Sequence, residues 1–227
     1  MRVDENVFFR QATLRICGTL EIEKTLLTSL DYLAGFMPAD LICLQIYEPE
    51  ANVLRIVSTA SRSGRRDANI IIGFDGAAKA VMHKVYERFE QSRWQDAVIV
   101  NDPAEDPAAR ITMEKIFDPD ASLLHLVLET ADRPLCSVIL AAKGKHRYSK
   151  EAAQLFSLLK EPFSIAMSNA LKYQDVIHLK EALAEDNRFL HRELFALSGD
   201  RIIGADSGLK KVMTLVNQVS MSDSSVL

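Results

Sequence analysis

Two apolar runs stand close together along the chain: Leu123-Leu124-His125-Leu126-Val127-Leu128-Glu129 and Leu135-Cys136-Ser137-Val138-Ile139-Leu140-Ala141. The segment between them, Thr130-Ala131-Asp132-Arg133-Pro134, contains residues that favour turns. Short apolar runs joined in this way are typical of a β-hairpin. We therefore predict two antiparallel strands here.

An earlier pair of runs, residues 41–47 and 53–59, is joined by Glu48-Pro49-Glu50-Ala51-Asn52 and predicts a second hairpin. Side chains alternate between the two faces of a strand. One face of the first run is purely aliphatic: Ile42, Leu44 and Ile46. The other face is mixed: Leu41, Cys43, Gln45 and Tyr47.

The later hairpin alternates in the same way. Its aliphatic face holds Leu124, Leu126 and Leu128, and its mixed face holds Leu123, His125, Val127 and Glu129. We expect the aliphatic faces to lie against the terminal helices. The mixed faces offer a few polar groups among apolar ones, which is characteristic of ligand pockets.

Helical periodicity and capping residues predict the remaining elements. A long helix begins after the N-cap Ser149, extends to about residue 197 with a kink at Pro162, and ends at Gly199. The other predicted helices cover residues 7–16, 21–36, 77–88 and 108–117, and short strands cover 69–72 and 97–100. This order predicts an α+β fold, in which an antiparallel sheet has helices on both faces.

Composition limits the classes of function. The 227 residues are 48% hydrophobic and 26% charged, which is ordinary for a globular protein. A net charge of −4 argues against a nucleic-acid-binding domain, which needs a basic surface. The sequence has no membrane-length apolar run, no signal peptide and no paired cysteine motif. We expect a cytoplasmic protein that does not contact a membrane.

Three segments resemble a GAF domain in their order and spacing: Ile72-Gly73-Phe74-Asp75-Gly76-Ala77-Ala78, Val100-Asn101-Asp102-Pro103-Ala104-Glu105-Asp106-Pro107, and His146-Arg147-Tyr148-Ser149. The resemblance covers roughly residues 5–173. It implies a small-molecule sensor or dimerisation module with a GAF-like antiparallel sheet and a ligand pocket on one face of that sheet.

Residues 200–227 resemble the start of the AAA+ ATPase domain in bacterial sigma-54-dependent transcriptional activators. The similar segments include Asp200-Arg201-Ile202-Ile203-Gly204-Ala205-Asp206-Ser207 and Ser224-Ser225-Val226-Leu227. The phosphate-binding loop would follow next, so we expect this chain not to hydrolyse ATP itself. The resemblance implies that Ile202, Ile203 and Gly204 cover the adenine of ATP, and that ATP, magnesium, sigma-54 RNA polymerase and DNA are bound through downstream parts.

The resemblance divides the chain into a sensory domain (residues 1–172), a signalling helix (173–198) and the start of an ATPase domain (199–227). Along the signalling helix, one seam is apolar at every seventh residue: Val176, Leu183, Leu190 and Leu197. The other seam holds Leu179, Asp186 and Glu193. Such a seam can pair loosely with a second copy, which predicts a homodimer. The alternative is that the apolar column packs against its own domain.

The candidate ligand-binding residues follow from the mixed strand faces and from the GAF-like segment. They are Cys43, Gln45, Tyr47, Phe74, His125 and Val127. The effector is an unknown small molecule, and we expect no resident cofactor. Gln45 and His125 could instead be core residues that are satisfied by neighbouring groups.

The sequence gives little support for a metal site or a catalytic site. Cys43, His125 and Cys136 are residue types that bind metal ions. However, the hairpin turn sets His125 opposite Ile139, about 10 Å from Cys136, which is too far for both to bind one ion. Arg62, Arg65 and Arg66 could clamp an anion or be solvated. Asp102 and Asp106 are explained by turn formation and helix capping. We expect neither a metal site nor catalytic residues.

Three functions remain in order of preference. The first is a sensory domain that controls a downstream AAA+ ATPase through dimer and linker-helix rearrangement. The second is a GAF dimerisation module with a filled core and no ligand. The third is a methionine sulfoxide reductase, since some GAF-fold proteins reduce free methionine sulfoxide with pocket cysteines, and Cys17, Cys43 and Cys136 offer no suitable pair.

Overall fold

The computed structural model describes residues 3–62, 64, 68–91, 96–128, 135–197 and 204–220. The chain forms two compact units, Met1–Gln174 and Asp175–Leu227. The first unit holds the sheet and is considered first.

A six-stranded antiparallel sheet forms the centre of the first unit, with strand order β3-β2-β1-β6-β5-β4. The two predicted hairpins are β1–β2 and β5–β6, and they join where β1 pairs with β6. The strands are β1 (Leu41–Glu48), β2 (Val53–Ser61), β3 (Ala68–Gly73), β4 (Val98–Val100), β5 (Ser122–Leu128) and β6 (Leu135–Ala142).

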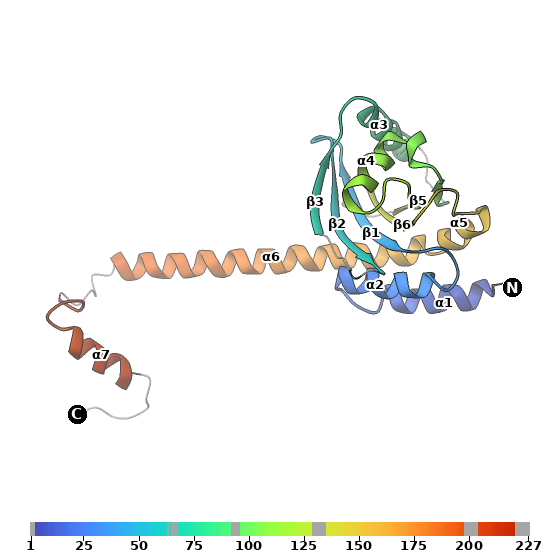
Figure 1. The fold of residues 1–227 in the computed structure, drawn as a ribbon. Helices are drawn as coiled ribbons and strands as arrows, with labels where there is room; N and C mark the ends of the chain where they lie inside the picture. Colours follow the sequence, from blue (N-terminus) through green and yellow to red (C-terminus); the bar gives the residue numbers. More distant parts are fainter. Residues whose placement is uncertain are drawn as a thin grey trace. The chain divides into compact units, whose positions relative to one another are not determined.

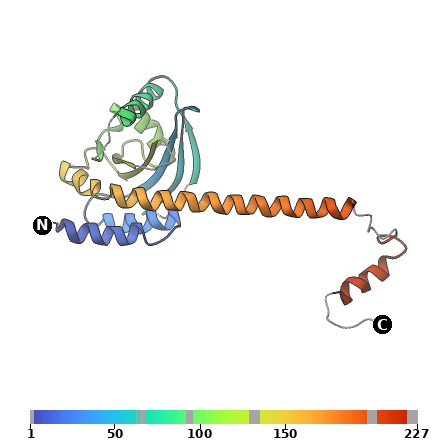
Figure 2. The same ribbon diagram turned by 180° about the vertical axis from the view of Figure 1, so that it is seen from behind.

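Helices cover both faces of this sheet (Figures 1 and 2). On one face lie α1 (Glu5–Ile16), α2 (Ile22–Leu33), α5 (Lys150–Ser157) and the first part of α6 (Lys160–Leu197). On the other face lie α3 (Gly76–Gln91), the short helix η1 (Pro103–Glu105) and α4 (Pro107–Ile116). The predicted α+β architecture is confirmed.

The strand alternation separates two cores, as the sequence predicts. Ile42, Leu44 and Ile46 belong to the core beneath the terminal helices, together with the aliphatic face of β5. Leu41, Cys43 and Tyr47 belong to the second core, beneath α3 and α4, together with Leu123 and Val127. The polar groups of the mixed faces therefore lie between the sheet and α3 and α4.

The predicted long helix is divided in two. Ser149 caps α5 as predicted, since its hydroxyl oxygen accepts from the amide of Ala152 at 3.3 Å. However, α5 ends at Ser157, and α6 begins at Lys160. Pro162 does not kink the helix but lies in the first turn of α6, where its missing N–H has no partner to lose. The helix thus breaks just before the proline.

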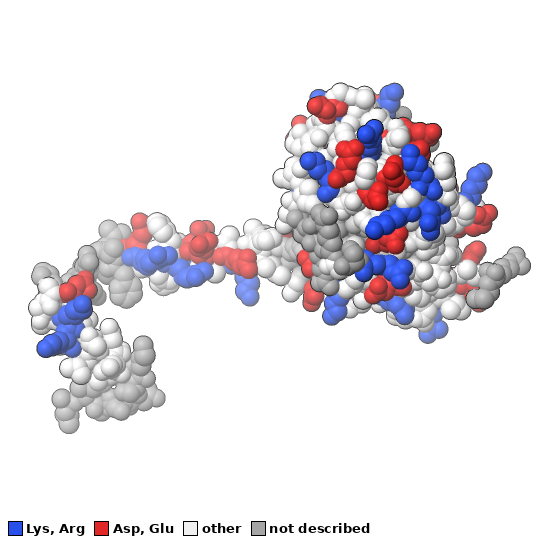
Figure 3. All heavy atoms as spheres, viewed as in Figure 1, with Lys and Arg blue, Asp and Glu red and all other residues white. Residues whose placement is uncertain are grey.

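The second unit contains the remainder of α6, from Asp175, and α7 (Lys210–Val219). Helix α6 continues unbroken to Leu197. Charges of both signs are intermixed on the face of the molecule in Figure 3, both over the first unit and along α6. No helix in the described part of the chain is long and apolar enough to span a membrane.

Candidate ligand cavity

A small cavity of about 60 Å³ lies between the sheet and the α3–α4 layer. The strands supply its floor: Gln45 and Tyr47 from β1, Leu54 from β2, Val100 from β4, Leu123 and His125 from β5, and Ser137 and Ile139 from β6. Helices α3 and α4 cover it with Val81, Met82, Val85, Ala108, Ala109, Thr112 and Met113, and Asp106 lies at its edge.

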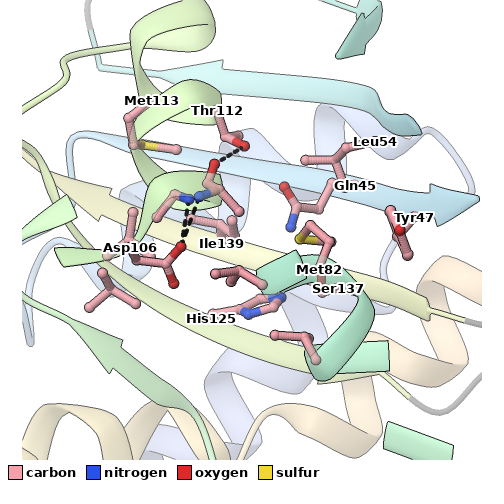
Figure 4. Close-up of a pocket in the computed structure, with 16 residues that line it drawn as sticks. Gln45, Tyr47, Leu54, Met82, Asp106, Thr112, Met113, His125, Ser137 and Ile139 are labelled. Atoms are coloured by element: carbon pink, nitrogen blue, oxygen red, sulfur yellow. Dashed lines mark hydrogen bonds between the residues drawn. The ribbon is translucent and has the colours of Figure 1, made fainter. Parts of the chain in front are cut away.

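Strand register brings the two most polar floor residues together. Gln45 is paired with Ser137 across β1 and β6, and His125 is paired with Ile139 across β6 and β5. Because β6 separates β1 from β5, Gln45 and His125 lie on a diagonal across three strands. Their side chains turn towards each other across the cavity in Figure 4.

Asp106 precedes α4 and serves as its N-cap. Its Oδ1 accepts hydrogen bonds from the amides of Ala108 and Ala109, each at 3.0 Å. Such capping satisfies two N–H groups that have no partner inside the helix. Thr112, one turn further on, donates its hydroxyl to the carbonyl of Ala108 at 2.8 Å. These hydrogen bonds fix the end of α4 that faces the cavity (Figure 4).

Two polar atoms on the cavity floor have no hydrogen-bond partner among the described residues. They are Oε1 of Gln45 and Nε2 of His125. Gln45 is only 5% exposed, so water does not reach its amide freely from outside. A buried polar atom without a partner costs about 1–3 kcal/mol of folding free energy. A bound molecule with matching polar groups would remove this penalty.

Burial keeps the imidazole of His125 neutral. The surrounding protein lowers the pKa of His125 to about 4, and the nearby carboxylate of Asp106 offsets only part of that effect. A neutral imidazole has one N–H donor and one acceptor nitrogen. His125 can therefore donate to or accept from a bound group, depending on its tautomer.

No protein-family model matches the chain. Over 123 residues it is 32% identical to the formate hydrogenlyase transcriptional activator FhlA of Escherichia coli (strain K12), a match that covers 53% of this chain and 18% of the relative. The formate hydrogenlyase transcriptional activator of Salmonella typhimurium (strain SL1344) is 24% identical over 220 residues, which is 95% of this chain and 31% of the relative. The chain thus spans less than a third of the length of these relatives.

Solved structures share the architecture of the first unit. The GAF domain from an Acinetobacter phosphoenolpyruvate-protein phosphotransferase superposes with a TM-score of 0.51 at 10% identity, over 77% of this chain and 99% of that chain. The fold is that of a GAF domain. The phycocyanobilin-bound GAF domain from a cyanobacterial phytochrome gives 0.51 at 11% identity, over 75% and 97% of the two chains. The predicted resemblance to the GAF domain of a transcriptional activator is confirmed.

The predicted ligand-binding residues of the GAF domain divide into two groups. Gln45, Tyr47 and His125 line the cavity. Cys43, Phe74 and Val127 are buried in the same core but do not line the cavity. Phe74 instead helps to close the β1–β2 turn, because its carbonyl accepts from the side-chain amide of Asn52. The hydroxyl of Tyr47 donates to the carbonyl oxygen of the same amide at 3.0 Å.

The predicted ligand-binding residues do not include those of α3 and α4 that cover the cavity. Val81, Met82, Val85 and Met113 have ordinary helical spacing, which gives no signal beyond core packing. Asp106 was interpreted as a helix cap, and the structure shows that role. Its place beside the cavity depends on how α4 packs on the sheet.

The cysteines do not gather around the cavity. Cys43 belongs to the core beneath α3 and α4, whereas Cys136 belongs to the core on the opposite face of the sheet. His125 pairs with Ile139, as the hairpin geometry predicts, and Leu128 pairs with Cys136. Burial raises the pKa of the Cys43 thiol to about 12. Cys43 is therefore a protonated thiol at neutral pH, and a thiolate is the form that reacts.

The remaining predicted residues lie outside the GAF core. Val176, Leu179, Leu183 and Leu190 are exposed along α6, and nothing is described of the Leu197 side chain. Gly204 precedes α7, whereas Ile202 and Ile203 lie outside the described residues. Arg62 is exposed at the end of β2, and Arg65 and Arg66 also lie outside the described residues.

Proposed function

We propose that this GAF domain senses a small polar molecule within a transcriptional regulator. The relatives named as transcriptional activators and the GAF fold support a regulatory rather than a catalytic role. Ligand binding in the α3–α4 cavity would be the sensory event. The cavity supplies both the apolar enclosure and the few polar groups that such a site requires.

One observation carries this proposal: Gln45 and His125 each present to the same cavity a polar atom that has no partner among the described residues. Buried polar atoms are normally paired, and an unpaired one needs an explanation. A second unpaired atom beside the same cavity makes a missing partner the simplest explanation. That partner would be the effector, or water in its absence.

The sheet offers a route from the cavity to α6. Gln45 faces the cavity, while its neighbours Leu44 and Ile46 belong to the opposite core together with Phe163 and Met167 of α6. A ligand that changes the position or twist of β1 would change the packing beneath α6. Such coupling requires that the ligand bind two arrangements of the domain with different affinity.

We further propose that α6 pairs with its counterpart in a second copy of the chain. Val176, Leu179, Leu183 and Leu190 are each more than half exposed. Their heptad spacing fits a parallel two-helix seam, weakened by Asp186 and Glu193. A weak seam can shift between two arrangements and transmit the state of the sensor.

In a longer protein of this class, the signal would reach an AAA+ ATPase domain. ATP and magnesium would bind there, with Gly204 beside the adenine. Contacts with sigma-54 RNA polymerase and DNA would also belong to such downstream parts. The similarity of residues 200–227 to the start of that domain supports this part of the proposal.

Native mass spectrometry of the freshly purified chain tests both proposals. We expect a species at twice the chain mass with a small additional mass, and we expect Gln45→Leu to lose that additional mass while remaining dimeric. A dimer without additional mass, even after incubation with candidate effectors, contradicts ligand sensing. A monomer contradicts the α6 seam.

The small volume of the cavity favours one alternative, a GAF dimerisation module without a ligand. At about 60 Å³ the space could hold only a few waters. In that case Gln45 and His125 would bond to those waters, and no small molecule would raise the stability of the domain. A thermal-shift screen across polar metabolites distinguishes the two functions, because a ligand stabilises the folded state by mass action.

A further inference from the structure

We infer that the cavity selects a compact hydrogen-bond donor that is neutral or cationic, and that it rejects carboxylates. This inference rests on the proposed ligand-sensing function and names the chemical class of the ligand. It follows from the charges and the unpaired atoms that surround the cavity.

The charge around the cavity is negative. Among the described residues that line it, Asp106 is the only acidic one, and none is a lysine or an arginine. His125 stays neutral at physiological pH and supplies no positive charge. An anionic ligand would therefore meet one carboxylate and no cation in a space of low polarisability, where charges interact strongly.

The N-terminus of α4 would normally attract an anion, because its amides point outwards and the helix dipole is positive there. In this domain the side chain of Asp106 already occupies the N-terminus of α4. The Oδ1 of Asp106 accepts from the amides of both Ala108 and Ala109. A ligand carboxylate would have to displace Asp106 from its own helix.

The polar groups left over include two acceptors. Oε1 of Gln45 lacks a donor among the described residues, and the Asp106 carboxylate, whose Oδ1 caps α4, can accept further hydrogen bonds. The amide nitrogen of Gln45 is a donor on the same side chain. Nε2 of His125 can donate or accept a hydrogen bond. A ligand that satisfies this set must offer at least one N–H or O–H to Gln45 and gains a second contact by offering another to Asp106.

Size restricts the ligand further. A cavity needs about 10–15 Å³ in this measure to hold one water. The volume of about 60 Å³ therefore fits roughly four to six non-hydrogen atoms. Small amides and small ammonium ions combine this size with the required donors. At the limit of about 1.5 kcal/mol per non-hydrogen atom, a ligand of four such atoms binds with a dissociation constant no lower than roughly 0.04 mM.

Two matched pairs of probes test this inference: formamide against formate, and acetamide against acetate. Each pair differs mainly in charge and in the presence of N–H donors. Binding to the isotope-labelled full chain is followed through the NMR shifts of the Gln45 side-chain amide and the His125 ring. We expect each amide to bind at least about tenfold more tightly than its carboxylate.

Asp106→Asn removes the negative charge and keeps the cap of α4, because asparagine also caps helices well. We expect this variant to reduce the preference for amides over carboxylates to a few-fold or less. Asp102→Asn is the matched control. Asp102 caps η1 by accepting from the amide of Ala104 at 2.9 Å, and it does not line the cavity. This control should keep the wild-type preference.

The outcomes separate the inference from the function on which it rests. A carboxylate that binds in the cavity as tightly as its amide overturns the inference and leaves ligand sensing in place. The same holds if Asp106→Asn leaves the preference unchanged. If neither amide shifts Gln45 or His125 up to about 0.1 M, the inference is overturned, and a thermal-shift screen in which no polar metabolite stabilises the domain then overturns ligand sensing as well.

Discussion

The buried side chain of Gln45 lowers the stability of the empty domain and offers a hydrogen-bond acceptor to a ligand. Its side chain is almost fully buried, yet its Oε1 has no partner among the described residues. A leucine of similar volume would remove the unpaired oxygen. Natural proteins often keep such destabilising groups at functional sites.

We therefore predict that Gln45→Leu stabilises the empty domain by about 1 kcal/mol and abolishes binding of small amides. Urea denaturation measures the first effect and an NMR titration measures the second. Gln154→Leu on α5 is the matched control, since Gln154 is exposed and distant from the cavity lining. A marked loss of stability in Gln45→Leu, with none in Gln154→Leu, would indicate that Gln45 is satisfied in the fold.

His125 predicts a dependence of stability on pH. In the unfolded chain its imidazole takes up a proton near pH 6.5, whereas in the folded domain it resists protonation until about pH 4. The unfolded state therefore binds more protons between these values. Folding stability should fall as the pH drops from about 6.5 to 4, by at most about 3.5 kcal/mol from this residue.

Urea denaturation at pH 7 and pH 5 measures this loss. His125→Asn should lose less stability than the wild type over the same interval, since it has no imidazole to protonate. His83→Asn on α3 is the control, because the side chain of His83 is 67% exposed and meets water in both states. Equal losses in wild type and His125→Asn would contradict a buried neutral His125.

Among the elements, α6 has two environments along its length. Between Phe163 and Leu171 one face of the helix is buried in the core of the first unit, with Phe163, Ala166, Met167, Ala170 and Leu171. From Val176 to Leu194 its apolar side chains are exposed in the single chain. A helix with such a face in water needs a partner or strong local interactions.

We predict that Leu183→Glu weakens the dimer by roughly 100-fold, because it removes a buried leucine from each helix and places two like charges at the seam. Light scattering over a dilution series measures the dimer dissociation constant. Ala184→Glu introduces the same charge one residue away, at a position that points away from the seam, and should leave the dimer intact. If both variants stay dimeric, another surface holds the copies together.

At the scale of the whole molecule, the sheet of the first unit lies between the cavity and the first part of α6. The cavity floor and the α6 contacts use alternate residues of the same strands, so neither can move far without the other. If the two sites are coupled, the coupling must be reciprocal.

Reciprocity gives a direct test of signalling. We predict that Leu183→Glu, which lies outside the cavity, changes the affinity for acetamide by at least about fivefold. The direction reveals which assembly state the ligand favours. Equal affinities in the monomeric variant and the dimeric wild type would contradict transmission through α6.

The secondary structure and its two-faced strands could be predicted because they depend on neighbouring residues. The alternation of Gln45 with Leu44 and Ile46 is a local property of an extended chain. The caps Asp106 and Ser149 act within three residues of their own position. The break between α5 and α6 was misplaced by a few residues, because helix ends depend on small energy differences that packing can override.

The sequence alone therefore determined which side chains face which side of the sheet, where the helices are capped, and that His125 pairs with Ile139. Only the tertiary structure decided which polar residues share a cavity. Gln45, Asp106 and His125 line one cavity because β1 and β5 both pair with β6 and because α4 covers this part of the sheet. These are contacts between segments far apart in the chain, and their geometry depends on the packing of all side chains at once rather than on any local pattern.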